Sequence, residues 1–317
     1  MREDAFELAL CATLEREREA VVSRQLGTGV HGRRVMDIVC VEPGDRFPTR
    51  RALTAETIPP RAIESDIGPG CARNPATTFD CHPERAAEAV EAALACGFFE
   101  RERRGSRTLV RQTVRYPAWY DCLLGIENKP DLDRPGALET QLLTDVHLAV
   151  LDAVVLATAS HVTGAHLNRI PDPVGVWQFD PGAGERTVVR EPDPLPVAEP
   201  GVEILDRTPA RTDVRIADAD AKARTRRRVA ERAYGKGWRP DLPACERVDP
   251  DDAGVPHCPW KGRVVNPTVE CGPACDGHEP AAPPAFDADR ARAERSPWEP
   301  DPAGHVRRQS GLDAFRD

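Results

Sequence analysis

Three short, almost uninterrupted apolar runs constrain the fold of this chain more than any other feature of its sequence. They comprise residues 35–41, 122–126 and 153–158. Each is too short for a typical buried helix and has the length of a strand that is covered on both faces. Residues 136–150, between the second and third runs, have the spacing of an amphipathic helix, and residues 174–179 predict a further strand. The sequence therefore predicts a mixed α/β core.

Further elements flank these runs. Residues 4–23 have the spacing of a helix, and residues 27–34 form a glycine-rich polar turn. A helix is expected from Pro83 to Cys96, because proline favours the first turn and Gly97 ends the pattern. Residues 98–112 predict a β-hairpin with a charged turn, and a helix followed by a basic hairpin resembles a winged helix. A basic helix is expected at 219–233.

These elements suggest four parts along the chain. We expect a discontinuous core at residues 1–43 and 116–181, with a winged-helix-like α+β domain inserted at 44–115. Residues 182–278 are a C-terminal extension that contains cysteines, and the composition changes there towards proline. The tail at 279–317 is expected to be disordered, because it is polar and has few long apolar runs.

The basic residues are almost all arginine, and this affects what the net charge says about partners. The formal net charge is −9, and only four of the 43 basic residues are lysines. This acidic, arginine-rich composition resembles haloarchaeal proteomes, in which acidic surfaces keep proteins hydrated in concentrated salt. Since the Debye length is only about 3 Å at 1 M salt, an acidic chain from such a cell is not excluded from binding nucleic acid.

The sequence carries no sign of a membrane or a secretory pathway. It has no run of 18 apolar residues, and residues 1–4 lack the basic-then-apolar pattern of a signal peptide. We therefore expect a cytoplasmic protein with no membrane partner. In that compartment the ten cysteines are expected to bind metal or to be buried, and not to form structural disulfides.

The triplet Glu127-Asn128-Lys129 ends the second apolar run and carries the strongest chemical signal. Residues i and i+2 of a strand share a face, so Glu127 and Lys129 are expected to point into the same cleft. Asp37 lies inside the first apolar run, where an uncompensated charge is costly. Hydrolysis of a phosphodiester needs a hard divalent cation held by carboxylates, a deprotonated water, and a cation that stabilises the charge on phosphorus. Two carboxylates on neighbouring strands and a lysine supply these groups.

This arrangement resembles the PD-(D/E)XK nuclease superfamily, in particular its Holliday-junction-resolvase-like and RecB-like branches. The resemblance implies a restriction-endonuclease-like core in which Glu7, Asp37 and Glu127 bind Mg²⁺ or Mn²⁺. It also implies a catalytic role for Lys129 and for Gln141 on the following helix. Members of the family usually have a short hairpin between the aspartate and the triplet, whereas 89 residues intervene here, so we interpret residues 44–115 as an insertion.

Other interpretations of these residues are left open. A Glu–Lys pair on a strand also occurs as a structural ion pair. Asp220-Ala221-Lys222 has the same spacing, and we assign it to the start of the basic helix. Asp121 is a rival to Asp37, but it lies six residues before Glu127, roughly 20 Å along a strand.

Four cysteines of the extension are candidates for a second metal site: Cys245, Cys258, Cys271 and Cys275. Four thiolates are the ligands of structural zinc sites and of iron–sulfur clusters. The resemblance to RecB-like nucleases, some of which carry a cysteine-ligated cluster, keeps the second option open. Unligated cysteines are the alternative.

The sequence thus predicts a metal-dependent nuclease that acts on DNA, with a role in DNA repair, recombination or defence. We expect it to belong to a haloarchaeal family of unknown function. Candidate phosphate contacts are Arg33, Arg34, Arg103, Arg104 and Arg107. The alternatives are a non-enzymatic DNA-binding protein with a winged helix and a zinc site, or a degenerate nuclease core kept as a scaffold. A homodimer is an open option.

Overall fold

The chain divides into two units, which are described separately. The computed structural model describes residues 2–79, 81–133 and 136–304. Unit 1 consists of Met1–Pro43 and Tyr120–Trp298, and unit 2 consists of Gly44–Trp119 and the segment from Glu299 onward.

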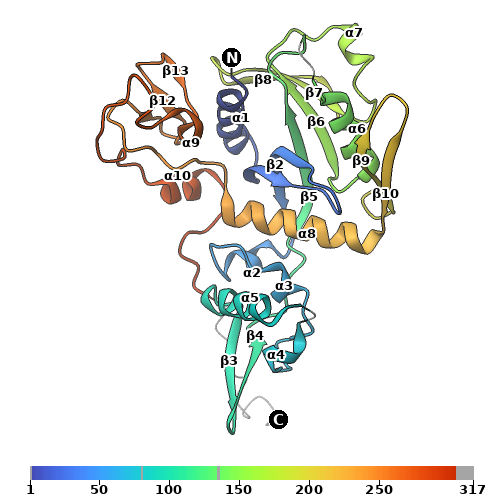
Figure 1. Cartoon of the computed structure of the whole chain (residues 1–317). Helices are drawn as coiled ribbons and strands as arrows, with labels where there is room; N and C mark the ends of the chain where they lie inside the picture. Colours follow the sequence, from blue (N-terminus) through green and yellow to red (C-terminus); the bar gives the residue numbers. More distant parts are fainter. Residues whose placement is uncertain (1, 80, 134–135, 305–317) are drawn as a thin grey trace, which may run out of the picture. The chain divides into compact units, whose positions relative to one another are not determined.

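A six-stranded mixed sheet forms the centre of unit 1 (Figure 1). Its strands lie in the order β1 (Val21–Gly27), β2 (Val35–Pro43), β5 (Tyr120–Asn128), β6 (Ala153–Thr158), β7 (Gly175–Asp180) and β8 (Glu185–Arg190). The pairs β1–β2, β2–β5 and β7–β8 are antiparallel, and β5–β6 and β6–β7 are parallel. The three apolar runs become β2, β5 and β6, so the predicted mixed α/β core is confirmed.

Helices cover both faces of this sheet. Helix α1 (Glu3–Glu17) packs on one face, where Ile38 and Ile126 lie in the same buried core as its apolar side chains. Helix α6 (Leu138–Leu148) connects the parallel strands β5 and β6, and in Figure 1 it lies across the sheet from α1. Because side chains alternate between the faces of a strand, this core fixes which residues of β2 and β5 point away from α1.

The first helix is shorter than predicted, and a strand follows it. The sequence predicts a helix over 4–23, whereas α1 ends at Glu17 and the backbone of Arg18 is extended. The β-branched Val21 and Val22 begin β1 and pair with β2, because tertiary pairing outweighs a continued helical spacing. Within β1, Gln25 has a φ of 53°, which is costly for a residue with a side chain.

A β-hairpin and a long helix follow the sheet in unit 1. The hairpin comprises β9 (Gly201–Arg207) and β10 (Thr212–Ala217), and α8 (Ala219–Lys236) is the basic helix expected at 219–233. Asp218 caps α8 by accepting a hydrogen bond from the amide of Ala221, at 2.7 Å. The short helix α7 (Gly164–Leu167) lies between β6 and β7.

The chain after α8 is built from very short elements. They are β11 (Asp249–Pro250), β12 (Pro256–Cys258), β13 (Arg263–Val264) and α9 (Pro267–Glu270), followed by α10 (Ala288–Arg295). The tail at 279–317 was predicted to be disordered, and its part up to residue 304 instead contains α10. Asp287 caps this helix, and the buried guanidinium of Arg292 donates to the carbonyl oxygens of Ala233 and Tyr234. Residues 305–317 lie outside the described residues.

Unit 2 is a small α+β unit with its own apolar core. Its elements are α2 (Phe47–Arg51), α3 (Pro60–Ile63), α4 (Pro75–Thr78), α5 (Pro83–Ala95), β3 (Phe99–Arg104) and β4 (Arg107–Gln112). The last three match the helix and hairpin that the sequence predicts, and Phe98 and Val110 are buried together with apolar residues of α5. In the sequence, unit 2 is inserted into unit 1 between Pro43 and Tyr120, and these two residues pair with each other in the large sheet. The two ends of the insertion are therefore adjacent.

No helix among the described residues is long and apolar enough to cross a membrane.

Candidate active site

The pairing of β2 with β5 places Asp37 and Glu127 at the same end of the sheet. Ile38 pairs with Ile126, so the residues next to them, Asp37 and Glu127, project together from the face opposite α1. The amide of Asn128 donates to Oδ2 of Asp37 at 2.8 Å, which ties the two strand ends together. The sequence predicted these two carboxylates on neighbouring strands, and the structure brings them together.

Glu7 joins this group from α1. Gln25 Nε2 donates to Oε2 of Glu7 at 2.8 Å and to Oδ1 of Asp37 at 3.2 Å, so a single amide bridges the two carboxylates. Nδ2 of Asn128 donates to the same Oε2 of Glu7 at 3.3 Å. On the other side, Nε of Arg24 donates to Oε1 of Glu7 at 2.5 Å. The positive φ of Gln25 thus occurs at the residue that links two carboxylates.

Arg34 and Asp145 complete the group on the α6 side. Arg34 Nη2 donates to Oε2 of Glu127 at 2.6 Å and to Oδ2 of Asp145 at 2.7 Å. Its Nε donates to Oδ1 of Asp145 at 2.9 Å, so Arg34 and Asp145 form a bidentate pair. Arg34 was a candidate for contact with phosphate, but its side chain is only 9% exposed and its donors face inward. We call Glu7, Asp37, Glu127 and Asp145 the carboxylate cluster.

Burial makes the carboxylate cluster hard to ionise. Burial, with the neighbouring charge of Asp37, raises the pKa of Glu127 to about 8. Burial likewise raises the pKa of Glu7 to about 7, although Arg24 opposes the shift. The pKa values of Asp37 and Asp145 are raised for the same reason. Burial opposes the ionised form of Arg34 too, but Asp145 and Glu127 outweigh it and raise the pKa of Arg34. Buried like charges of this kind are typical of sites that bind a cation.

Lys129 lies just past the end of β5 and turns towards the start of α1. Its Nζ is 3.4 Å from Oε1 of Glu3, and its side chain is 25% exposed. Because Glu3 lies in the first turn of α1, Lys129 lies on the side of the cluster where α1 begins. The charge of Glu3 also contributes to the raised pKa of Asp37. Gln141 lies one helical turn before Asp145 on α6 and is half-buried. It therefore shares a helix face with a member of the cluster.

The cluster offers oxygen ligands of the kind that Mg²⁺ and Mn²⁺ prefer. Asn128 Oδ1 is buried and has no hydrogen-bond partner, which leaves one further acceptor at the junction of Asp37 and Glu7. Within the described residues, no three or more His, Cys, Asp or Glu side chains are already arranged to hold an ion. At Glu127 and Asp145, the guanidinium of Arg34 occupies the place where an ion would bind and supplies a positive charge. The donor types, carboxylate and amide oxygens, are those that a hard cation prefers.

Sequence reasoning missed Asp145 as part of the site. It lies on α6 and is only 5% exposed. The signal that could have found it is helical spacing, since Asp145 follows Gln141 by four residues on a helix expected to cover the sheet.

The other candidate arginines lie apart from the cluster. Arg33 is exposed in the turn between β1 and β2. Arg103, Arg104 and Arg107 are exposed on the β3–β4 hairpin of unit 2, where Nε of Arg104 pairs with Glu102 at 2.6 Å.

The turn that carries Arg34 is fixed by a buried carboxylate from β9. The amides of Val30, His31 and Gly32 donate to Glu203 at 3.0, 2.7 and 3.0 Å, and Glu203 is 1% exposed. Three successive amides around one carboxylate form a nest, which positions the turn from a neighbouring element.

The four cysteines of the extension all lie in the segment after α8. Cys245 and Cys258 are buried, and Cys271 and Cys275 are half-buried. All are free thiols.

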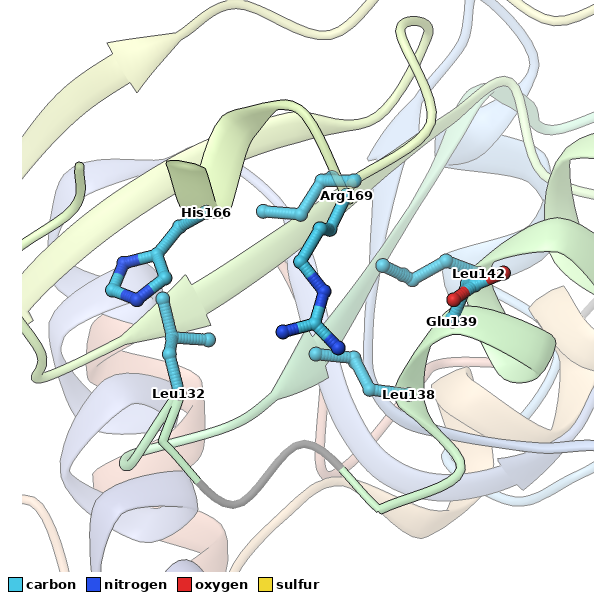
Figure 2. A pocket seen from close by; sticks show the side chains of 7 residues that line it. Leu132, Leu138, Glu139, Leu142, His166 and Arg169 are labelled. Carbon is cyan, nitrogen blue, oxygen red and sulfur yellow. The ribbon is translucent and has the colours of Figure 1, made fainter. Parts of the chain in front are cut away.

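A small apolar pocket lies between α6 and α7 (Figure 2). Its volume is about 40 Å³, and leucine side chains of α6 form one wall. In Figure 2 the side chain of Arg169 extends into the space between His166 and these leucines. None of the carboxylate cluster lines it. Its size is that of a water-filled crevice and not of a substrate site.

Comparison with known proteins gives one match. A family model described as "Family of unknown function (DUF5787)" matches residues 21–280. No curated protein matches the chain. No solved structure matches it either.

Proposed function

This chain belongs to the family of unknown function DUF5787, and from its carboxylate cluster we propose that it is a metal-dependent nuclease that hydrolyses phosphodiester bonds in DNA. The observation that carries the proposal is the convergence of Glu7, Asp37 and Glu127 at one end of the sheet, with raised pKa values. Burying several carboxylates at one point costs free energy, and Arg24 and Arg34 together supply fewer positive charges than the cluster has carboxylates, so a bound cation would offset the rest.

The core would be restriction-endonuclease-like. Helix α1, the antiparallel strands β1, β2 and β5, helix α6 and the parallel strand β6 follow in this order and present the cluster at one end. Each of the proposed ligands therefore comes from a different element of this core. Its rigid sheet would hold the ligands at a fixed separation, as a catalytic site requires.

Each residue of the site would have a distinct role. Glu7, Asp37 and Glu127 would hold Mg²⁺ or Mn²⁺, which would supply a polarised phosphate and an activated water. Asn128 would orient Asp37 and Glu7 through its amide groups. Lys129 would leave Glu3 and stabilise the charge that builds on the phosphate oxygens.

Unit 2 is proposed to be a winged-helix-like domain that holds DNA. Helix α5 is followed by the β3–β4 hairpin, whose exposed Arg103, Arg104 and Arg107 carry positive charge along a strand and turn. Arginines of this kind contact phosphates without reading sequence. Such a nuclease would act on DNA in the cytoplasm. Its role there would be in DNA repair, recombination or defence against invading DNA.

A degenerate core is the second candidate, and Arg34 is the observation that favours it. Its guanidinium is within 2.7 Å of both Glu127 and Asp145, so it pairs with two carboxylates and offsets one of their charges without an ion. In that case the core would be a scaffold with no activity.

Cleavage assays with matched variants separate the two candidates. Purified full-length protein is incubated at high salt with branched, linear and single-stranded DNA plus Mn²⁺ or Mg²⁺. We expect cleavage by the wild type, and a loss of at least about 100-fold for Asp37→Asn, Glu127→Gln and Lys129→Ala. Asp220→Asn, which removes an exposed carboxylate from the other Asp-x-Lys triplet, serves as control and should cleave normally.

Ion binding provides a second readout that does not require the correct substrate. Mn²⁺ should raise the melting temperature of the wild type and of Asp220→Asn, but not that of Glu127→Gln, because an ion stabilises only a fold that binds it. If the wild type neither cleaves DNA nor responds to Mn²⁺, the scaffold is correct. Cleavage that survives equally in Lys129→Ala would disprove the role of Lys129.

A further inference from the structure

The segment from residue 243 to residue 281, called here the cysteine module, has little besides its cysteines to hold it together. Its strands are two or three residues long, and its one helix, α9, has four residues. The apolar side chains of Ala253 and Val255 belong to the core cluster that includes α1, and Val264 packs against the same cluster. Elements this short rarely stay folded on hydrophobic burial alone, and small modules usually rely on a disulfide or a metal.

Three of the four cysteines each begin a tight backbone turn. The amide of Val248 donates to the carbonyl of Cys245 at 3.4 Å, and that of Lys261 donates to Cys258 at 3.1 Å. The amide of His278 donates to Cys275 at 2.8 Å. In such turns the following amides approach the first side chain, as they do in Asx turns, and can donate to a thiolate there.

Backbone pairing brings the turns together. Cys245 forms an isolated bridge with Pro280, and the amide of Glu246 donates to the carbonyl of Glu279 at 2.9 Å, so the chain after Cys275 returns beside Cys245. Cys258 pairs with Arg263 between β12 and β13. Arg263 in turn binds the carboxylate of Glu270, the residue before Cys271. These contacts connect the segments that carry the four cysteines, although the cysteines lie up to 30 residues apart in the sequence.

Cations gather beside Cys271. The carboxylate of Glu270, the residue before it, pairs with Arg2 at 3.0 Å, Lys261 at 3.6 Å and Arg263. Four thiolates around one Zn²⁺ carry a net charge of −2, and nearby cations favour such an anionic site.

We propose that Cys245, Cys258, Cys271 and Cys275 bind one Zn²⁺ ion as a structural tetrathiolate site. Each thiol loses its proton on binding, and four sulfur ligands complete the tetrahedral shell that Zn²⁺ prefers in structural sites. Among the described residues no group of such side chains is already arranged to hold an ion, so the proposal requires the four thiols to move together on binding. Binding draws the three turns together and closes the module beside α1. This site is independent of the proposed nuclease activity.

Metal analysis of the purified full-length protein tests the proposal. We expect about one zinc per chain, and a fall of at least about tenfold in Cys258→Ser and Cys271→Ser. Cys71→Ser is the matched control, because Cys71 is an exposed thiol of unit 2, and its zinc content should equal that of the wild type.

Two measurements cover variants that fail to fold. In the wild type, a mercurial thiol reagent should release the zinc, which a chromophoric chelator detects. Replacement of zinc by Co²⁺ should give the intense visible bands of tetrahedral thiolate coordination. A wild-type protein without zinc that also gives no such Co²⁺ spectrum would overturn the proposal. Iron with acid-labile sulfide in place of zinc would overturn it as well and assign an iron–sulfur cluster.

Discussion

Asn128 shows how a single residue can organise the carboxylate cluster. Its amide holds Asp37 and its side-chain Nδ2 holds Glu7, while its Oδ1 is buried without a partner. A buried acceptor that lacks a donor costs about 1–3 kcal/mol. The sequence does not predict the contact of Asn128 with Glu7, because that contact depends on the packing of a helix far away in the chain.

The pH dependence of stability follows from Glu7 and Glu127. Their pKa values in the folded protein are about 7 and about 8, above the ordinary value of 4.5. Between pH 4.5 and these values the folded state binds more protons than the unfolded state, so stability falls as pH rises through this window. The shift of Glu7 alone corresponds to roughly 3 kcal/mol. Urea unfolding of the metal-free protein at pH 5.5 and pH 8.5 measures the effect.

One variant and one added ion serve as controls for this pH experiment. Glu7→Gln should flatten the pH dependence, because the variant has no proton to lose at that position. Mn²⁺ should restore most of the stability at pH 8.5 if the cluster binds a cation. Stability that stays constant or increases between pH 5.5 and pH 8.5 would show that these carboxylates are ionised without cost.

At the scale of elements, the nest around Glu203 connects β9 with the turn that carries Arg34. Glu203→Gln keeps the shape of the side chain but removes its charge and one of its two acceptor oxygens, so we expect a loss of about 2 kcal/mol in the free energy of unfolding. The variant Asp206→Asn, at an exposed position of the same strand, should lose less than about 0.5 kcal/mol. Urea unfolding measures both, and equal losses would exclude a specific role for the nest.

The elements differ in how well the sequence predicts them, for physical reasons. Strands β2, β5 and β6 are covered on both faces and appear as apolar runs, so their pattern is almost free of ambiguity. The sequence prediction extends the first helix into β1, because residues 18–20 contain no proline or glycine that would mark the end of the helix. Strands β8, β9 and β10 are largely exposed and polar, and their pairing depends on neighbours that the local sequence does not specify.

The same reasoning applies to the candidate site. Asp37 and Glu127 were predictable because each interrupts or ends an apolar run. The roles of Gln25 and Arg34 could not be predicted, because polar residues in a strand and a turn usually face water. Only the register between β1 and β2 and the position of α6 direct them inward.

At the scale of the whole molecule, the insertion of unit 2 should be separable from the large sheet. Pro43 and Tyr120 pair in that sheet, so a two-residue Asn-Gly turn can replace residues 44–119 without moving either strand. We expect this shortened chain to fold cooperatively and to keep its response to Mn²⁺. We also expect its affinity for DNA to fall at least about tenfold, because the arginines of the β3–β4 hairpin are lost.

A matched variant tests whether any loss of DNA binding comes from charge. In the full-length chain, Arg103, Arg104 and Arg107 are changed together to glutamine, and DNA binding is measured by fluorescence anisotropy at two salt concentrations. The variant should bind as weakly as the shortened chain and show a smaller salt dependence. Unchanged affinity in both proteins would place the DNA-binding surface elsewhere in the chain.

The ion pairs of Arg34 with Glu127 and Asp145 imply a concentration threshold. Any divalent ion that uses Glu127 must first displace a guanidinium already in place, so the free energy of breaking these contacts is subtracted from the affinity of the ion. The proposed site would therefore need a higher concentration of metal than the same site without Arg34. For an enzyme that cuts DNA, this internal competitor would serve as a safeguard that needs no inhibitor protein.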